Sequence, residues 1–192
     1  MQLLRILGAL AILCIAGALF FVLWRARAIK RRHLRVLAAQ PSQASLDELG
    51  LAGPRLFQSD AALYHGTRFA DGAAFLGPAL RAPCVGELFC GERALFLRRE
   101  PGAPLSSQQP FLCWPLSSVE EASLHRGYAP LAGKELPLLR LRWRSGGEQL
   151  LSELSLRGGM EQLEKLRREI HLRQNRGEAL VQLGKLLQKE PW

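Results

Sequence analysis

The chain has 192 residues, of which 26 are lysine or arginine and 17 are aspartate or glutamate, giving a formal net charge of +9 at pH 7. Residues 1–36 hold seven of the basic residues and no acidic one, so the remaining chain carries 19 basic against 17 acidic residues and is nearly neutral. A nucleic-acid-binding domain carries its surplus charge on the folded domain, with a recognisable reading motif. Neither feature is visible, which excludes nucleic acid as the partner.

The first predicted element is an apolar helix. Nineteen uncharged residues occupy positions 6–24, and at about 1.5 Å per residue they come close to crossing a hydrocarbon core about 30 Å thick. We expect a transmembrane anchor that includes Ile6, Leu13, Phe20 and, at the interface, Trp24. A cleaved secretory signal would carry its basic flank before a shorter apolar run, and a core helix rarely stays uncharged on all faces.

A cluster of six basic residues follows the apolar run directly. Its members are Arg25, Arg27, Lys30, Arg31, Arg32 and Arg35, whereas Arg5 and the chain amine are the only positive groups before the run. Because such an excess stays on the cytoplasmic side, we expect a single-pass protein of the cell (inner) membrane, with its N-terminus outside and the remaining chain cytoplasmic. Attraction to anionic lipid head groups is a second expected role of this cluster.

A short linker is expected after the anchor. The helix is predicted to run to about Leu37 and to end before Pro41, because the residue preceding a proline is pushed out of helical geometry. Ser45 and Glu48 have capping-box spacing and predict a short helix. The chain thus divides into an anchor with its basic flank over 1–37, a linker over 38–55, a folded domain over 56–174 and a short helix over 175–192.

Short strands are predicted from residue 56 onward. In residues 139–144 three apolar residues alternate with three arginines, the period of a half-buried antiparallel strand with Leu139, Leu141 and Trp143 inside. Residues 145–147 turn the chain and residues 149–156 return, which predicts a hairpin. A second hairpin is expected over 87–97, and further strands within 111–114 and 56–67.

Helical spacing replaces the strand pattern near the C-terminus. Met160, Leu163 and Ile170 lie on one face, so residues 159 to about 174 are predicted to form an amphipathic helix that stops at 175–177. Beyond it Leu180, Leu183 and Leu187 predict a shorter helix. This helix either binds a partner or packs onto the domain.

Three segments resemble a known family. Residues 63–67 (Leu-Tyr-His-Gly-Thr), 86–96 and 114–119 (Trp-Pro-Leu-Ser-Ser-Val) are similar, in order and spacing, to segments of bacterial PH-like and GRAM-like domains. The resemblance covers residues 56–174 and implies a mainly β (α+β) fold, a small antiparallel β-barrel capped by a C-terminal amphipathic helix. It also implies a binding or scaffolding module without catalytic machinery, with a protein or lipid as its ligand.

Candidate contacts for an anionic ligand or an acidic partner are arginines of the strand region. They are Arg68, Arg81, Arg98, Arg99, Arg140, Arg142 and Arg144. Phosphoinositide-binding PH domains carry a denser basic cluster around the first hairpin, so solvated surface arginines are the alternative for this set.

An enzyme would need a nucleophile, a base and a group to orient them. Candidates exist one by one, but none sits in a nucleophile elbow, a zinc-protease motif or a phosphate loop. They are His65, His125, Cys84, Cys90 and Asp60 or Asp71. The alternative function is a small membrane-bound hydrolase or thiol enzyme using His65 or a cysteine.

The remaining cysteines and histidines carry no motif. The four cysteines form no Cys-x-x-Cys pair, so we expect Cys84, Cys90 and Cys113 to be small buried residues, with no metal and no cofactor. His33 and His171 lie on or next to predicted helices and are expected to face solvent.

Overall fold

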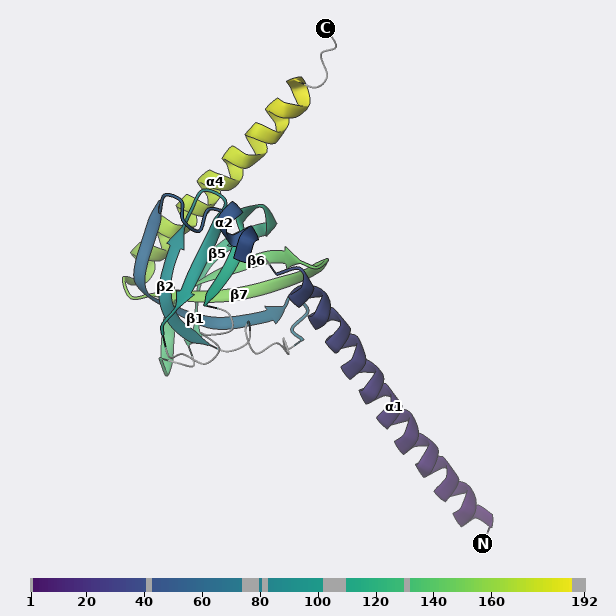
Figure 1. Cartoon of the computed structure of the whole chain (residues 1–192). Helices are drawn as coiled ribbons and strands as arrows, with labels where there is room; N and C mark the ends of the chain where they lie inside the picture. Colours follow the sequence, from purple (N-terminus) through teal and green to yellow (C-terminus); the bar gives the residue numbers. More distant parts are fainter. Residues whose placement is uncertain are drawn as a thin grey trace.

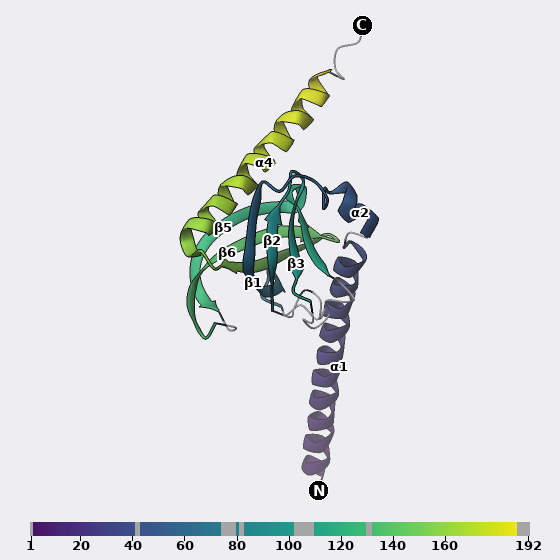
Figure 2. The same cartoon turned by 60° about the vertical axis from the view of Figure 1, so that its left-hand side comes forward.

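The computed structural model describes residues 2–40, 43–73, 80, 83–101, 110–129 and 132–187, without the side chains of 3–7, 9, 43–45 and 177–187. A long N-terminal helix, α1 (Gln2–Ala38), reaches a curled β-sheet at its C-terminal end. The last helix, α4 (Gly159–Leu187), packs on the sheet and then extends beyond it on the side away from α1 (Figures 1 and 2).

Helix α1 is continuous through the apolar run and the basic cluster. Its segment Leu10–Ala38 contains a window of 18 residues with a mean hydropathy of 1.9 and none buried, so the helix is long and apolar enough to cross a membrane. Leu13, Phe20 and Trp24 are exposed, as an anchor requires, while the side chain of Ile6 lies outside the described residues. A core helix would instead be covered by the domain.

The sheet is antiparallel throughout. Its strands are β1 (Phe57–Phe69), β2 (Cys84–Cys90), β3 (Ala94–Arg99), β4 (Phe111–Pro115), β5 (Val119–Ala129), β6 (Lys134–Ser145) and β7 (Glu148–Leu156). They pair in the order β4-β3-β2-β1-β7-β6-β5. The described strands include no pairing between β4 and β5, so the expected barrel is present as an open sheet. The short helix η1 (Leu116–Ser118) joins these two edges, and α4 contacts η1 as well as β5, β6 and β7.

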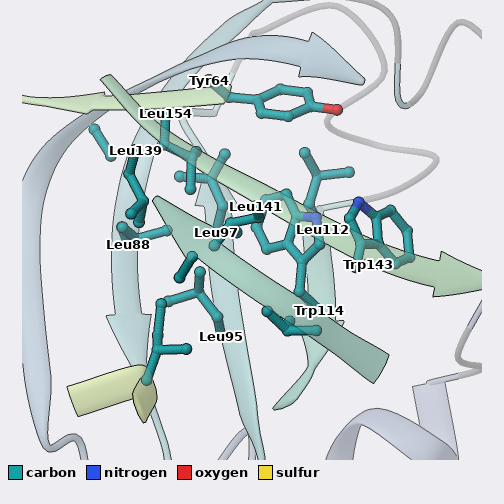
Figure 3. Packing of buried hydrophobic residues seen from close by; sticks show 14 of the residues in the cluster. Tyr64, Leu88, Leu95, Leu97, Leu112, Trp114, Leu139, Leu141, Trp143 and Leu154 are labelled. Carbon is teal, nitrogen blue, oxygen red and sulfur yellow. The ribbon is translucent and has the colours of Figure 1, made fainter. Parts of the chain in front are cut away.

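The predicted inner faces are confirmed. Leu139, Leu141 and Trp143 of β6 are buried, and Leu154 of β7 packs with them (Figure 3). Burial of such side chains contributes about 1.5–3 kcal/mol each. Ser152 of β7 lies among them and accepts hydrogen bonds from the indole N–H groups of Trp114 at 3.2 Å and Trp143 at 2.9 Å. Both indoles are therefore buried without losing a polar partner.

The linker helix covers a second, smaller core. Helix α2 (Gln43–Glu48) starts two residues before the predicted cap at Ser45, so Ser45 lies inside the helix. Leu46 packs on the sheet with Phe89 and Phe96, whose rings stack at 5.1 Å. The linker is thereby attached to β2 and β3.

Two expectations about elements are corrected. Strand β5 was not predicted as a separate strand, and its register with β6 runs over its whole length, from Val119↔Trp143 to Ala129↔Lys134. Helix α4 continues through the expected stop at 175–177 to Leu187 as one helix. A glycine inside a helix costs only about 1 kcal/mol, which the rest of a long helix can offset.

Candidate functional site

The basic end of α1 lies against the folded domain along one face. Ile29 is partly buried in the main core, and Val36 is fully buried there. His33, one helical turn from each, is 8% exposed, which corrects the expectation that it faces solvent. The spacing of four and then three residues is that of one helix face. The last third of α1 is therefore docked on the domain.

The turn between β6 and β7 makes the closest approach to α1. Gly146 and Gly147 have φ angles of +58° and +78°, the left-handed conformation that a two-residue hairpin turn needs. A Cβ atom on Gly146 would lie 2.4 Å from the carbonyl oxygen of Arg35. Only glycine fits both the turn and the contact with the helix backbone.

Glu148 holds the docked helix by two ion pairs. One carboxylate oxygen accepts a hydrogen bond from Arg32 Nε at 2.7 Å, and the other lies 2.7 Å from Arg35 Nη2. The Glu148 side chain is only 12% exposed, so solvent screens these contacts less than it screens a surface ion pair. Two members of the basic cluster therefore attach α1 to the domain.

Arg32 is the centre of this junction. Its Nη1 donates to Asp71 at 2.6 Å, and its guanidinium lies 4.2 Å from the ring centroid of Phe69 at the end of β1. The backbone N–H of Ala73 and the Arg32 guanidinium hold the pKa of Asp71 below its ordinary value. Asp71 therefore stays charged opposite Arg32 at neutral pH.

A groove lies beside this junction, between α1 and the end of β1; we call it the anchor groove. It encloses about 370 Å³ and is lined by Trp24, Arg25, Ala28, Ile29, Arg32, Asp71, Gly72 and Ala73. Its helix side begins at the residue predicted to mark the membrane interface.

The flanking basic residues fall into two groups. Arg32 and Arg35 pair with carboxylates, whereas the described part of the chain offers no carboxylate partner to Arg25, Arg27, Lys30 or Arg31. This second group keeps its positive charge available to ligands outside the protein.

The candidate arginines of the strands are mostly compensated. Arg140 lies 2.8 Å and Arg68 3.1 Å from Glu153 on β7, which stands between their strands. Three further pairs join Arg142 to Glu121 at 3.1 Å, Arg144 to Glu120, and Arg98 to Glu87. The outward row of β6 is thus nearly neutral, and an anionic ligand would have to displace carboxylates.

Of the other two arginines of that set, only Arg99 is among the described residues. Arg99 is buried, at the end of β3. Arg81 lies outside the described residues. The six described arginines of the set are thus either paired with carboxylates or, for Arg99, buried.

A serine and a histidine are close enough to interact. His65 Nε2 and Ser155 Oγ are 2.9 Å apart, the distance of a nucleophile and its base. Ser155 is only 2% exposed, and His65 Nδ1 is buried without a hydrogen-bond partner. Burial also lowers the pKa of His65. The pair thus lacks both access and the carboxylate that would orient the ring.

The three cysteines of the domain are buried, as predicted. Burial raises the pKa of Cys90 and of Cys113 to about 12 and raises that of Cys84 as well. A thiol with such a pKa is almost fully protonated at neutral pH and is a poor nucleophile.

The predicted partner helix is the outer part of α4. Its backbone is helical to Leu187, while the side chains of Leu180, Leu183 and Leu187 lie outside the described ones. This part of α4 extends beyond the sheet in both views (Figures 1 and 2).

Comparison of the sequence with protein-family models and with curated proteins gives no match. Sequence reasoning placed Gly146 in a turn and gave Asp71 only as an isolated catalytic candidate, and it did not predict the contacts of these residues or of Glu148 with α1. Each of these contacts joins residues at least 39 positions apart in sequence. A signal was present on α1, where Ile29, Arg32 and Val36 share one face.

Proposed function

We propose that the chain is a non-catalytic, membrane-anchored binding or scaffolding module whose PH-like domain is held beside the bilayer on its cytoplasmic side. The observation that carries the proposal is the docking of α1, in which Glu148 binds both Arg32 and Arg35. A flexible tether would need no such contacts. A scaffold, in contrast, gains from presenting its surfaces in one orientation.

The PH-like assignment is supported by the order of elements. Seven antiparallel strands are followed by one helix, and Leu163, Leu166 and Ile170 of that helix join the main core. The resemblance implies strands followed by a capping helix, and the strands form an open sheet in place of the barrel that it also implies. Fold alone does not choose a ligand, so the proposal of binding rests on the docking and on the charge pattern.

A protein partner is proposed for the outer part of α4. This part points away from α1, so in an anchored protein it reaches outward from the bilayer (Figures 1 and 2). Leu180, Leu183 and Leu187 have the spacing with which an amphipathic helix enters a partner's groove.

Crosslinking and mass spectrometry of the tagged full chain in its own cells test this proposal. We expect one protein to be enriched reproducibly and to be lost when Leu180, Leu183 and Leu187 are replaced by serine together. Leu172→Ser is the matched control, because Leu172 lies on the same helix and is 58% exposed. Enrichment that survives the triple substitution would contradict the role of the outer helix. Absence of any reproducible partner would contradict the scaffold.

A second candidate, a small membrane-bound hydrolase, is favoured by one observation, the 2.9 Å contact between His65 and Ser155. A fluorophosphonate probe tests it on the full chain, with Ser155→Ala as the control. Labelling that disappears in this variant would replace the non-catalytic proposal. We expect no labelling, because Ser155 is buried and His65 has no orienting carboxylate.

A further inference from the structure

We propose that the anchor groove binds the head group of an anionic phospholipid from the leaflet next to the folded domain. The inference deepens the proposed function and rests on the membrane insertion of α1. It moves the site of lipid contact from the strand arginines to the junction of anchor and domain.

The position of the anchor groove along α1 matches the depth of lipid head groups. Trp24 and Arg32, the ends of its helix side, are eight residues apart, or about 12 Å along a helix. The polar layer on each side of a bilayer is about 5–8 Å thick. With Trp24 at the boundary of the hydrocarbon, the groove spans the depth at which head groups lie.

The charged groups that line the anchor groove favour an anionic ligand. The lining includes Arg25 and Arg32 against one carboxylate, that of Asp71. Arg32 is already held by Asp71 and Glu148, so Arg25 is left as the cation with no described carboxylate partner. A phosphate would complete its hydrogen bonds, and an arginine and a phosphate suit one another in geometry.

The apolar walls of the anchor groove suit the less polar part of a lipid. Trp24, Ala28 and Ile29 form an apolar side on α1, and Ala73 lies opposite. Apolar walls suit the glycerol and the first carbons of a lipid, while Arg25 reaches the phosphate. A volume of about 370 Å³ falls at the lower end of the range of roughly 300–1,000 Å³ for small-molecule sites.

The arginines of β6 differ from Arg25 because they are paired with carboxylates. Arg140, Arg142 and Arg144 each face a carboxylate, so they offer an anionic lipid little net attraction. Lipid selection by this protein therefore depends on the anchor side of the junction.

The test measures lipid retention by the full chain in a mild detergent. Native mass spectrometry counts bound phosphatidylglycerol and, separately, bound phosphatidylcholine. We expect retention of phosphatidylglycerol to exceed that of phosphatidylcholine, and Arg25→Ala to lower it about tenfold, the effect of losing one charge-assisted hydrogen bond. Arg27→Ala is the matched control, since Arg27 lies at nearly the same depth, is exposed and does not line the groove.

A second pair of variants tests the groove without changing charge. Ala28→Trp fills it, and Ala26→Trp adds the same ring at an exposed position outside the lining. We expect only Ala28→Trp to abolish retention of phosphatidylglycerol. Equal losses with Arg25→Ala and Arg27→Ala would show diffuse attraction to the basic flank and overturn the site. Equal retention of the two lipids would overturn it as well.

A separate experiment, extraction with alkaline carbonate, tests whether α1 spans the bilayer. If the full chain is extracted from membranes by alkaline carbonate, then α1 does not span the bilayer and the proposed function fails. If the chain resists extraction but shows no lipid selection, only the groove assignment fails.

Discussion

Glu148 joins two parts of the chain that are 116 residues apart in sequence, because its carboxylate binds Arg32 while also reaching Arg35. At 12% exposure it is the most buried member of this charge cluster. This side chain at the start of β7 therefore holds α1 together with the apolar contacts of Ile29 and Val36.

Replacing Glu148 by glutamine is expected to lower the free energy of unfolding of the domain by about 1–3 kcal/mol, because two charge-assisted contacts are lost. The value should lie toward the lower end, since Arg35 is 60% exposed. Thermal unfolding of the full chain in micelles, followed by circular dichroism, measures the change. Glu121→Gln, which removes an exposed pair with Arg142, serves as the control and should alter stability by less than about 0.5 kcal/mol.

Gly146 and Gly147 offer a comparison of two neighbouring residues with the same backbone requirement. Alanine at either position is strained by about 1 kcal/mol because φ is positive. At Gly146 the new methyl group would also meet the backbone of Arg35, whereas nothing lies within 4 Å at Gly147. We expect Gly146→Ala to be the more destabilising by about 1–3 kcal/mol in chemical denaturation. Equal effects would mean that the turn does not touch α1.

The buried thiols predict a dependence of stability on pH. The pKa of Cys113 is about 12 in the folded protein and about 8.5 in an unfolded chain, so above pH 8.5 the unfolded state binds fewer protons. Stability from this group is complete below that pH and declines as the pH rises toward 12. The free-energy difference between the protein and its Cys113→Ala variant should therefore fall by about 2 kcal/mol between pH 8 and 10. A constant difference would show that the thiol is not desolvated.

At the scale of elements, α4 is held by its first half. Leu163, Leu166 and Ile170 are buried against the sheet, while Leu172 on the same helix is 58% exposed. The first half of the helix thus has one face packed on the sheet and an opposite, exposed face that includes Leu172.

Leu166→Ala is expected to cost about 2–5 kcal/mol of unfolding free energy, because it leaves a cavity in the main core. Leu172→Ala should change it by less than about 0.5 kcal/mol. Urea denaturation of the two variants compares them directly. Similar losses for both would mean that Leu172 is also covered.

The elements that sequence reasoning predicted are those whose pattern is local. Leu139, Leu141 and Trp143 alternate with arginines, and this period alone placed β6 and its inner face. Strand β5 was missed because Val119–Ala129 contains few β-branched residues, and pairing with β6 holds it in place. The end of the C-terminal helix was misplaced because Gly177 was interpreted as a stop.

The docking site was less accessible to sequence reasoning, because its parts come from distant segments. The basic flank was recognised as a charge cluster, but its division into paired and available arginines depends on where Glu148 and Asp71 lie. In the same way, the sequence pattern predicted that the arginines of β6 face outward. It did not predict their carboxylate partners, which come from β5 and β7.

At the scale of the whole molecule, the sheet lies between an anchor helix and an outward helix. Helix α1 leaves on one side and the outer part of α4 on the other (Figures 1 and 2). The ion pairs of Glu148 and the close approach at Gly146 hold the domain to the anchor. The molecule thus has a docked helix at one end of the sheet and a projecting helix at the other (Figures 1 and 2).

Docking of α1 should hold the domain in one orientation, and a distance between two spin labels tests this directly. Labels at Leu34 on α1 and Arg157 after β7, both exposed, are measured by double electron–electron resonance on the full chain in lipid nanodiscs, with Cys14 replaced by serine. We expect one narrow distance distribution, which broadens in the Glu148→Gln variant. A broad distribution in the protein that keeps Glu148 would contradict a fixed orientation, because a flexible tether samples many orientations.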